Sequence, residues 1–480
     1  MLGLYEVAHT AKQPLEPSGS LQGDQQACQD TFDTFVDQLR QDLHSKGRSD
    51  TRAKVKLVAD AIWAKLSGVF SKEVLHAQHV SVFCHILQGK YGKGKRQLDC
   101  AGVVTTTLAA VQRLATHEEH ADLCRCRLQV SEDHCWISTG PAREDAIEVT
   151  TDTAAKRGLA PSAEAWAGWL YNGGHAIMCS PQMAVTALVA SLNPAIVARQ
   201  NTGTDSAEVQ ELQKQLLEMI HRDFPQAMYP AAICALADLK EIDEQDALNR
   251  LIERDTEEAA TTLSQDNGLS SAKSLFTEAI ERASAGEEGA CGYQWYVYSY
   301  QAGYLLRRAA FMLEKLGTQP GASEQAMHLI REAAALLGSR GSAVLQKYRY
   351  CSADGELYKD VEGVLEGLCN AISLLHGHLD QLLQDTALAQ GLLQFWDGIC
   401  CLLSAQAKPN HWLQQQLKAL KLFEPEARSA AAGHVLETSS SIAMRKTAGM
   451  WGALKPAPLR MIFGMGDVED LGRQVKRPKR

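Results

Sequence analysis

The chain has 480 residues, of which 45% are hydrophobic and 22% are charged, and its formal net charge is −9. This composition is ordinary for a soluble globular protein, and the length allows roughly two to four domains that each bury a core. The acidic balance argues against a body that coats nucleic acid and favours a basic peptide or protein as the partner.

The 13 cysteines are scattered, and most lie in apolar runs of helical character. No Cys-x-x-Cys pair occurs, so we expect reduced, buried thiols in a nuclear or cytosolic protein. The N-terminus lacks a basic start followed by an apolar run, and no apolar segment is long enough to span a bilayer. We therefore expect no signal peptide, no membrane association, no metal site and no cofactor.

The N-terminal part is predicted to be a flexible leader followed by helices. The first 30 residues carry several Pro, Gly and Gln, which favours flexibility. Apolar residues at helical spacing predict a helix over Thr31–Leu43, and Asp50 is the predicted N-cap residue of the helix that carries Val55 to Leu66. Another helix is predicted around His76–Leu87.

A small α+β domain is predicted over roughly residues 50–155. Cys100–Leu114 is typical of a buried helix of small and branched residues. Strand character follows in Asp122–Val130, Cys135–Ser138 and Ala146–Thr150.

After Gly158 the pattern predicts helices only. The segments with helical spacing are Met183–Leu192, Leu212–Ile220, Tyr229–Leu239, Tyr293–Leu316, Glu324–Leu337 and residues 385–425. Pairs of helices joined by a short turn are typical of tetratricopeptide-like repeats, although the spacing alone supports only a helical solenoid or bundle. An Ala/Ser-rich linker is predicted over 425–442.

The basic tail consists of Lys476, Arg477, Lys479 and Arg480. Such a cluster is suited to receptor recognition as a nuclear import signal. The alternative is a solvated terminus.

Three residues occur in the linear order of a Cys-His-acid catalytic site: Cys100, His134 and Glu148. Cys100 lies in the first turn of its predicted helix, where the helix dipole lowers a thiol pKa. A thiol nucleophile needs a base within hydrogen-bond reach, and the base needs an orienting acid. The alternative is three structural residues. Cys135 has no assigned role, and Asp133 is a second candidate acid.

An aromatic stripe and several acids lie on the predicted helices. Tyr296, Tyr300 and Tyr304 fall at i, i+4 and i+8 on one face. Such stripes usually pack in a core, but tyrosines also suit a half-wet peptide groove. The acids on the same run of helices are Glu208, Asp238, Glu356 and Asp360. They form either a solvated acidic face or a wall that binds arginines.

Many short motifs along the chain resemble the menin family of chromatin-associated tumour-suppressor scaffolds. Together they span roughly residues 55–400 in one order: Leu57–Trp63, Ser131–Trp136, Ala146–Thr150, Gly168–Tyr171, Leu192–Pro194, Tyr229-Pro230, Leu236–Leu239, Ala302–Tyr304, Tyr348–Cys351, Glu356–Lys359 and Phe395–Cys400.

The resemblance implies a mainly α fold with a small α+β part. It implies a flexible leader and N-terminal helix over 1–49, a transglutaminase-like thumb over 50–179 and a helical-repeat, tetratricopeptide-like palm with a central pocket over 180–383. Helical fingers, the linker and the basic tail would follow over 384–480.

The resemblance also implies a non-enzymatic nuclear adaptor. Its expected partners are Phe-Pro-containing, arginine-bearing peptides of a trithorax-type histone methyltransferase and of Jun-type transcription factors, with indirect chromatin association. The peptide-binding positions carried over are Ser131, Asp133, His134, Ala190, Ser191, Glu208, Tyr229, Asp238, Tyr296, Tyr300, Glu356 and Asp360.

The chain departs from the family pattern at several positions. Ala187, Ala231 and Ser299 stand where the familiar animal proteins have Phe, Met and Met, and Cys100 stands where they have no cysteine. Loss of apolar area weakens an aromatic or proline anchor by about 25 cal/mol per Å².

Two hypotheses follow. The favoured one is a scaffold that binds a linear motif. The alternative is a transglutaminase- or papain-like acyl transferase or hydrolase, in which Cys100 attacks an amide, His134 carries the proton and Glu148 orients the imidazole.

Overall fold

The structure is a computed structural model of the whole chain, and it describes most of the residues between 19 and 404. The described ranges are 19–47, 50–66, 80–90, 92, 96, 98–131, 134–151, 153–163, 176–190, 205–254, 271–285, 295–317, 321–347, 361, 364, 367–368, 371, 374 and 385–404. The predicted linker and the basic tail lie outside these residues, as does the first part of the predicted leader.

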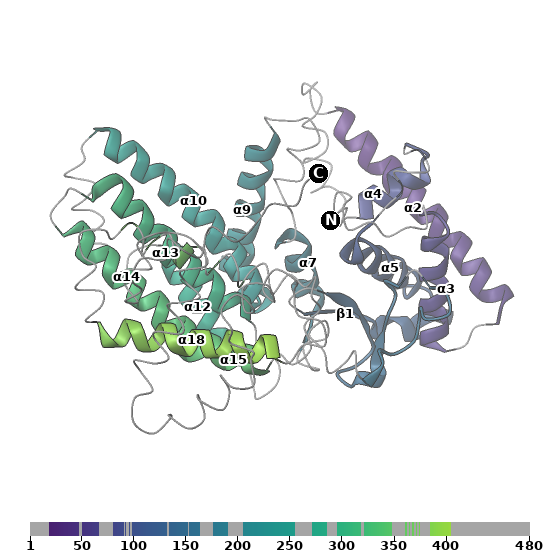
Figure 1. The fold of residues 1–480 in the computed structure, drawn as a ribbon. Coiled ribbons are helices and arrows are strands. Elements are labelled where there is room, and N and C mark those ends of the chain that lie inside the picture. Colours follow the sequence, from purple (N-terminus) through teal and green to yellow (C-terminus); the bar gives the residue numbers. More distant parts are fainter. Residues whose placement is uncertain are drawn as a thin grey trace, which may run out of the picture. The chain divides into compact units, whose positions relative to one another are not determined.

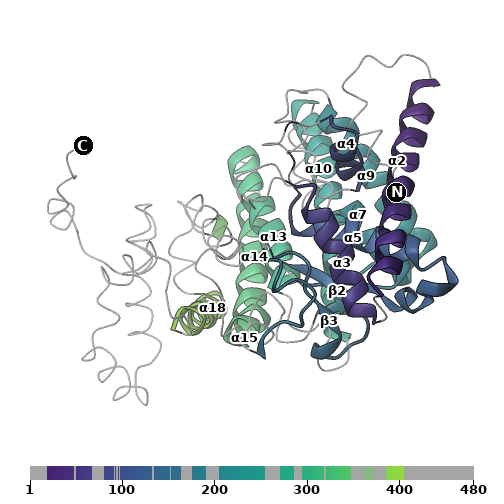
Figure 2. The same cartoon turned by 90° about the vertical axis from the view of Figure 1, so that its right-hand side faces the viewer.

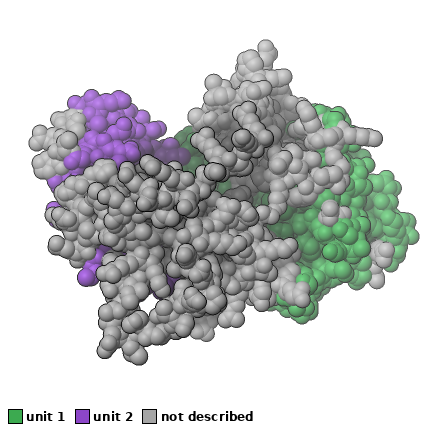
Figure 3. All heavy atoms as spheres, viewed as in Figure 1, with its two compact units in different colours: residues 1–240, 281–292 green, residues 241–280, 293–480 purple. Residues whose placement is uncertain are grey.

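The chain divides into two compact units (Figure 3). Unit 1 comprises residues 1–240 and 281–292, and unit 2 comprises residues 241–280 and 293–480. The boundary falls within two long helices, α10 (Pro230–Arg254) and α12 (Ser271–Ala285). The predicted four-part division remains a prediction, and each unit is described by itself.

Unit 1 combines helices with a small sheet (Figure 1). Its further α-helices are α2 (Gly19–Ser45), α3 (Thr51–Trp63), α4 (Val80–Leu87), α5 (Cys100–Leu114), α7 (Pro181–Ala190) and α9 (Asp205–Asp223). Its 3-10 helices are η2 (Glu118–Arg125), η3 (Arg143–Asp145) and η5 (Pro225–Ala227). Its strands are β1 (Arg127–Val130), β2 (Cys135–Ser138), β3 (Ala146–Ile147) and β4 (Ile177–Met178).

Helix α2 begins 12 residues before the predicted Thr31, inside the segment that was expected to be flexible. Cys28 is fully buried and extends the apolar face that continues with Phe32, because residues four apart lie on the same face of a helix. Hydrogen bonds between side chains four residues apart, such as Gln29 to Asp33, also support this turn.

The N-cap prediction at Asp50 is confirmed, since its side chain accepts a hydrogen bond from the N–H of Ala53 at 2.8 Å. The same helix, α3, carries the buried Lys54, whose Nζ lies 2.5 Å from Asp122 Oδ1. Asp122 is therefore held in η2, and the predicted strand over Asp122–Val130 is confined to β1.

The sheet is antiparallel, with the strand order β3-β2-β1-β4. β2 has the predicted bounds, whereas β3 is shorter than the predicted Ala146–Thr150. Glu148 leaves the ladder because its N–H donates to Leu159 O and its carbonyl accepts from Gly158. β4 was not predicted, since two residues carry too little periodicity.

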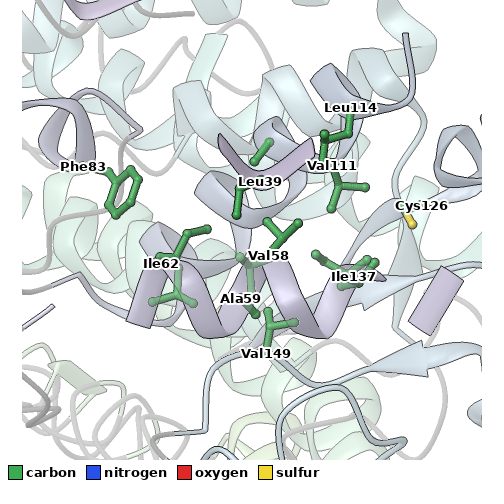
Figure 4. Close-up of a cluster of buried hydrophobic side chains, with 14 of the residues drawn as sticks. Leu39, Val58, Ala59, Ile62, Phe83, Val111, Leu114, Cys126, Ile137 and Val149 are labelled. Carbon is green, nitrogen blue, oxygen red and sulfur yellow. The ribbon is translucent and has the colours of Figure 1, made fainter. Parts of the chain in front are cut away.

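The predicted helix Cys100–Leu114 is confirmed as α5, which packs against β1 and β2. Its residues Val103, Val111 and Leu114 are fully buried, as predicted, whereas Leu108 is only partly buried. The core of unit 1 lies between α5, α3, α2 and the sheet (Figure 4). Burial of such side chains stabilises the fold by about 1.5–3 kcal/mol each.

Unit 2 is helical in its described part. It contains the C-terminal part of α10 and the N-terminal part of α12. Its other helices are α13 (Trp295–Leu316), α14 (Ala322–Leu336), the π-helix η6 (Leu337–Gly341), α15 (Ser342–Lys347) and α18 (Thr386–Ser404). Helices α13 and α14 pack side by side, as the two perpendicular views in Figures 1 and 2 show. The hairpin of α13 and α14 matches the predicted helix pair within about two residues at each end.

Glycines allow the backbones of unit 2 to approach closely. A Cβ atom on Gly391 of α18 would lie 2.7 Å from Ala334 O, and one on Gly398 would lie 2.7 Å from Ser342 Cα. Nearby, the rings of Trp295 and Phe395 stack at 6.0 Å between centroids. The glycines therefore set the distance between α18 and the segment α14 to α15.

The described residues contain neither a helix suited to a membrane nor a cluster suited to a metal ion. No described helix has the length and apolar character to cross a membrane. Nor do three or more His, Cys, Asp or Glu side chains of the described part gather as metal ligands would.

Candidate functional site

Cys100 is the first residue of α5, and its neighbours determine how that helix begins. Asp99 is the N-cap: its Oδ1 accepts from the N–H of Gly102 at 2.7 Å, and its carbonyl accepts from the N–H of Val103. Asp99 thus satisfies two of the helix's first N–H groups. The N–H groups of Cys100 and Ala101, which also lie in the first turn, have no acceptor within the helix.

His134 and Glu148 approach Cys100 from the sheet side. His134 Nε2 lies 3.1 Å from Glu148 Oε2, and the two side chains are 12% and 13% exposed. His134 also forms a side-chain hydrogen bond with Cys100. Because Glu148 occupies Nε2, Nδ1 is the ring nitrogen available to the thiol. The structure therefore brings together all three residues of the predicted Cys-His-acid site.

The histidine ring is fixed from several sides. The backbone carbonyl of His134 accepts from the N–H of Ser131 at 2.8 Å and from Ser131 Oγ at 3.2 Å. Its ring stacks on Trp136 at 5.9 Å between centroids. Trp136 is itself held by a 2.9 Å hydrogen bond from its Nε1 to Gln129 Oε1 on the neighbouring strand.

Glu148 is equally constrained. Its Oε1 accepts from the N–H and the hydroxyl of Thr150, at 2.6 and 2.5 Å, which leaves Oε2 for His134. The next carbonyl, that of Val149, accepts from Trp63 Nε1 of α3 at 2.9 Å. Thr150 was not singled out from the sequence, although its position two residues after an acid is a common local hydrogen-bond pattern.

The environment favours the charged form of Cys100. Its pKa is lowered to about 6, chiefly by a hydrogen bond from the Cys135 thiol and also by the hydrogen bond and charge of His134, against burial and the charge of Asp99. Burial opposes the charge of His134, but its hydrogen bonds to Cys100 and Glu148 raise its pKa to about 10. Between these values the pair is a thiolate and an imidazolium.

Cys135 is the second functional residue that the sequence did not assign. It opens β2, is 8% exposed, and its pKa is raised by the hydrogen bond to Cys100 and by burial. It therefore stays protonated and donates to the thiolate. His134 lies one residue before β2, so the alternation of side chains along a strand does not separate it from Cys135.

Four of the predicted peptide-binding residues of unit 1 are described with their surroundings. Ser131 and His134 belong to the cysteine site. Tyr229 lies near Cys135 of this site, and its pKa is raised by burial and by the nearby Cys179 and Cys135. The carbonyl of Ala190, at the end of α7, accepts from Gln213 Nε2.

The remaining positions are distributed over helices or lie outside the described residues. Asp238 is half-buried on α10, and Glu208 lies on α9. In unit 2, Tyr296 and Tyr300 of α13 are half-buried with ring centroids 5.9 Å apart. The predicted positions Asp133, Ser191, Glu356 and Asp360 lie outside the described residues, as do Lys476, Arg477, Lys479 and Arg480.

The predicted three-tyrosine stripe divides into two environments. Tyr304 is 3% exposed and packs against Phe276 at 5.4 Å between ring centroids, so it belongs to the core. Tyr296 and Tyr300 are partly exposed. Only these two members are therefore available to a partner.

Comparison with known proteins identifies the family. The family model described as Menin matches residues 27–437. A solved structure of menin, reported as revealing the binding site for the Mixed Lineage Leukemia (MLL) protein, is 26% identical with a TM-score of 0.57, and the alignment covers 96% of this chain and 89% of that one. The match spans most of the sequence, and the chain therefore belongs to the menin family.

Proposed function

We propose that this protein is a nuclear scaffold that binds short peptides of an MLL-type histone methyltransferase. The observation that carries the proposal is the family match over residues 27–437, together with the likeness to a menin structure reported with its MLL-binding site. Recognition of transcription factors of the Jun type, indirect chromatin association and nuclear localisation through the basic tail belong to the same proposal.

The chemistry of the carried-over positions agrees with a peptide partner. Tyr296 and Tyr300 offer aromatic faces with hydroxyl groups, which suit a partly hydrated groove. Asp238 supplies a half-buried carboxylate on α10. An arginine of the peptide pairs with such carboxylates, and a Phe-Pro segment packs on the tyrosines.

Three positions with smaller side chains are expected to change the preference for the peptide. Ser299 is buried, and its Oγ donates to Tyr296 O at 3.1 Å, so it adds no apolar surface to a partner. Ala231 is exposed and Ala187 is half-buried. We expect weaker apolar anchoring than a family member with Phe and Met there provides.

The architecture proposed with this function is a transglutaminase-like thumb over 50–179, a tetratricopeptide-like palm over 180–383 and helical fingers beyond. The observations that agree with it are the antiparallel sheet beside α5 in unit 1 and the helical hairpin of α13 and α14 in unit 2.

The test is fluorescence anisotropy with a labelled peptide that carries Phe-Pro and arginine. Tyr300→Ala weakens binding at least tenfold, because buried aromatic anchors carry most of the energy at an interface. Asp238→Asn also weakens it, whereas Asp246→Asn, an exposed acid on the same helix, leaves it unchanged. Failure of the folded protein to bind any such peptide, or equal binding by all three variants, refutes the proposal.

A further inference from the structure

We propose that Cys100, His134 and Glu148 form an acyl-transfer site, at which the sulfur of Cys100 attacks the carbonyl carbon of an ester or amide. The inference does not require that the scaffold binds a peptide, although His134 is also one of the carried-over peptide-binding positions. It stands on a nucleophile, a base and an orienting acid in mutual hydrogen-bond contact, where His134 Nε2 and Glu148 Oε2 are 3.1 Å apart.

The nucleophile is placed where attack is possible. Cys100 is partly exposed, unlike Cys126, Cys135, Cys179 and Cys234, which are buried. Burial raises the pKa of Cys126 and Cys179 to about 12, whereas the hydrogen bonds around Cys100 lower its pKa to about 6. Among the described cysteines with a clear pKa shift, Cys100 has the only lowered one. A buried structural cysteine does not show this combination.

The base is held in position for proton transfer. Glu148 contacts Nε2 of His134, and Thr150 fixes the orientation of Glu148, which leaves Nδ1 as the ring nitrogen for the hydrogen bond with the thiol. The ring of His134 also stacks on Trp136, with the planes 26° apart. His134 is thus a catalytic residue, and Glu148 is a positioning residue that acts through it.

The start of α5 supplies hydrogen-bond donors for the oxyanion. Cys100 and Ala101 open α5, so their N–H groups have no acceptor within the helix, while Asp99 accepts from the N–H groups of Gly102 and Val103. The positive end of the helix dipole lies at the same place. Negative charge that develops on the carbonyl oxygen during attack is therefore stabilised beside the sulfur.

The charges around the sulfur restrict the acyl donor. Two carboxylates lie near the thiolate–imidazolium pair. The charge of Asp99 raises the pKa of Cys100 and Cys135, and the charge of Glu148 raises the pKa of His134 and Cys135. Tyr229, near Cys135, stays neutral because burial raises its pKa. Neutral or cationic acyl groups are therefore favoured over anionic ones.

The reaction balances without any further group. The thiolate forms an S–C bond, and the C–O or C–N bond of the donor breaks as His134 gives its proton to the leaving oxygen or nitrogen. Water or an amine then attacks the thioester while His134 takes the proton of the attacking group. The S–C bond breaks, which releases the carboxylic acid or the new amide and restores the thiolate.

The probe is p-nitrophenyl acetate, a neutral ester, added at pH 7 to the full-length protein. Acetylation of each cysteine is followed by peptide mass spectrometry, and the exposed Cys124 serves as the internal reference. We expect Cys100 to be acetylated at least tenfold faster than Cys124. His134→Ala removes this advantage, Cys100→Ser abolishes the product, and Cys124→Ser leaves the Cys100 rate unchanged.

A second variant keeps the test decisive if His134→Ala fails to fold. Glu148→Gln preserves size but removes the charge that raises the pKa of His134. It therefore shifts the pH profile of acetyl loss from Cys100 toward lower pH, which a purely structural role for Glu148 does not do. Equal acetylation of Cys100 and Cys124, or a Cys100 rate that is unaffected by His134→Ala and Glu148→Gln, overturns the proposal.

Discussion

The hydrogen bond from Cys135 to Cys100 can be tested by removing one thiol. The Cys135 thiol is the largest of the influences that lower the pKa of Cys100. Cys135→Ala deletes this donor and leaves His134, Glu148 and the start of α5 in place. Because the donor stabilises the thiolate and not the thiol, its loss raises the pKa of Cys100.

The size of the effect follows from the strength of the bond. A hydrogen bond to a charged group contributes about 1.5–3 kcal/mol, and one pKa unit corresponds to about 1.36 kcal/mol. The pKa of Cys100 should therefore rise from about 6 to about 7–8. At pH 6 the thiolate fraction then falls from about one half to between about one tenth and one hundredth.

The assay is the rate of alkylation of Cys100 by iodoacetamide, read by peptide mass spectrometry. A range of about pH 4–10 includes the pKa of Cys100 both in the unaltered protein and in Cys135→Ala. In the unaltered protein the rate rises through a midpoint near pH 6, because a thiol reacts only when deprotonated. Cys135→Ala moves this midpoint upward, and Cys135→Ser moves it less because a hydroxyl donor remains. A midpoint that is the same in all three proteins refutes the assigned hydrogen bond, provided thermal unfolding shows each to be folded.

Two further substitutions test the packing of each unit by thermal and chemical unfolding. Lys54→Met leaves the carboxylate of Asp122 without its cation and should lower the stability of unit 1 by about 2 kcal/mol. This is below the usual cost of breaking a buried ion pair because Asp122 is 32% exposed. The control is Lys56→Met, at a side chain that is 37% exposed, which should change the stability by less than about 1 kcal/mol. Gly391→Ala should destabilise unit 2 by about 2 kcal/mol, since the new Cβ meets a backbone carbonyl at 2.7 Å. Gly92→Ala, where nothing lies within 4 Å, should have no effect. A loss of stability in each control equal to that in its partner contradicts the packing argument.

Local chemistry explains which elements could be predicted from the sequence. The bounds of α5 follow from a capping acid and a run of small apolar residues, and those of β2 from a short branched and aromatic run. The segment around Asp122 was predicted as a strand because its partner, Lys54, lies 68 positions away. Periodicity within a window cannot include such a contact.

The same limit applies to the candidate site. The order of Cys100, His134 and Glu148 indicated their roles, but their proximity depends on the packing of α5 against the sheet. The role of Cys135 could not be predicted, because the face of the sheet on which a side chain lies is set by the register of the strands, which the sequence alone does not give. Thr150 could be assigned only once Glu148 had left the sheet ladder.

The glycine contacts of α18 restrict how this part of the chain can vary. Gly391 and Gly398 are seven residues apart, so they lie on one face of the helix, and each faces main-chain atoms of the opposite segment. A larger residue at Gly391 meets the backbone carbonyl of Ala334. Every residue type has this carbonyl, so no substitution at position 334 removes the contact. A second substitution can compensate for a clash between two side chains, but it cannot remove a clash with the backbone. The packing of α18 against α14 is therefore recovered only when position 391 returns to glycine.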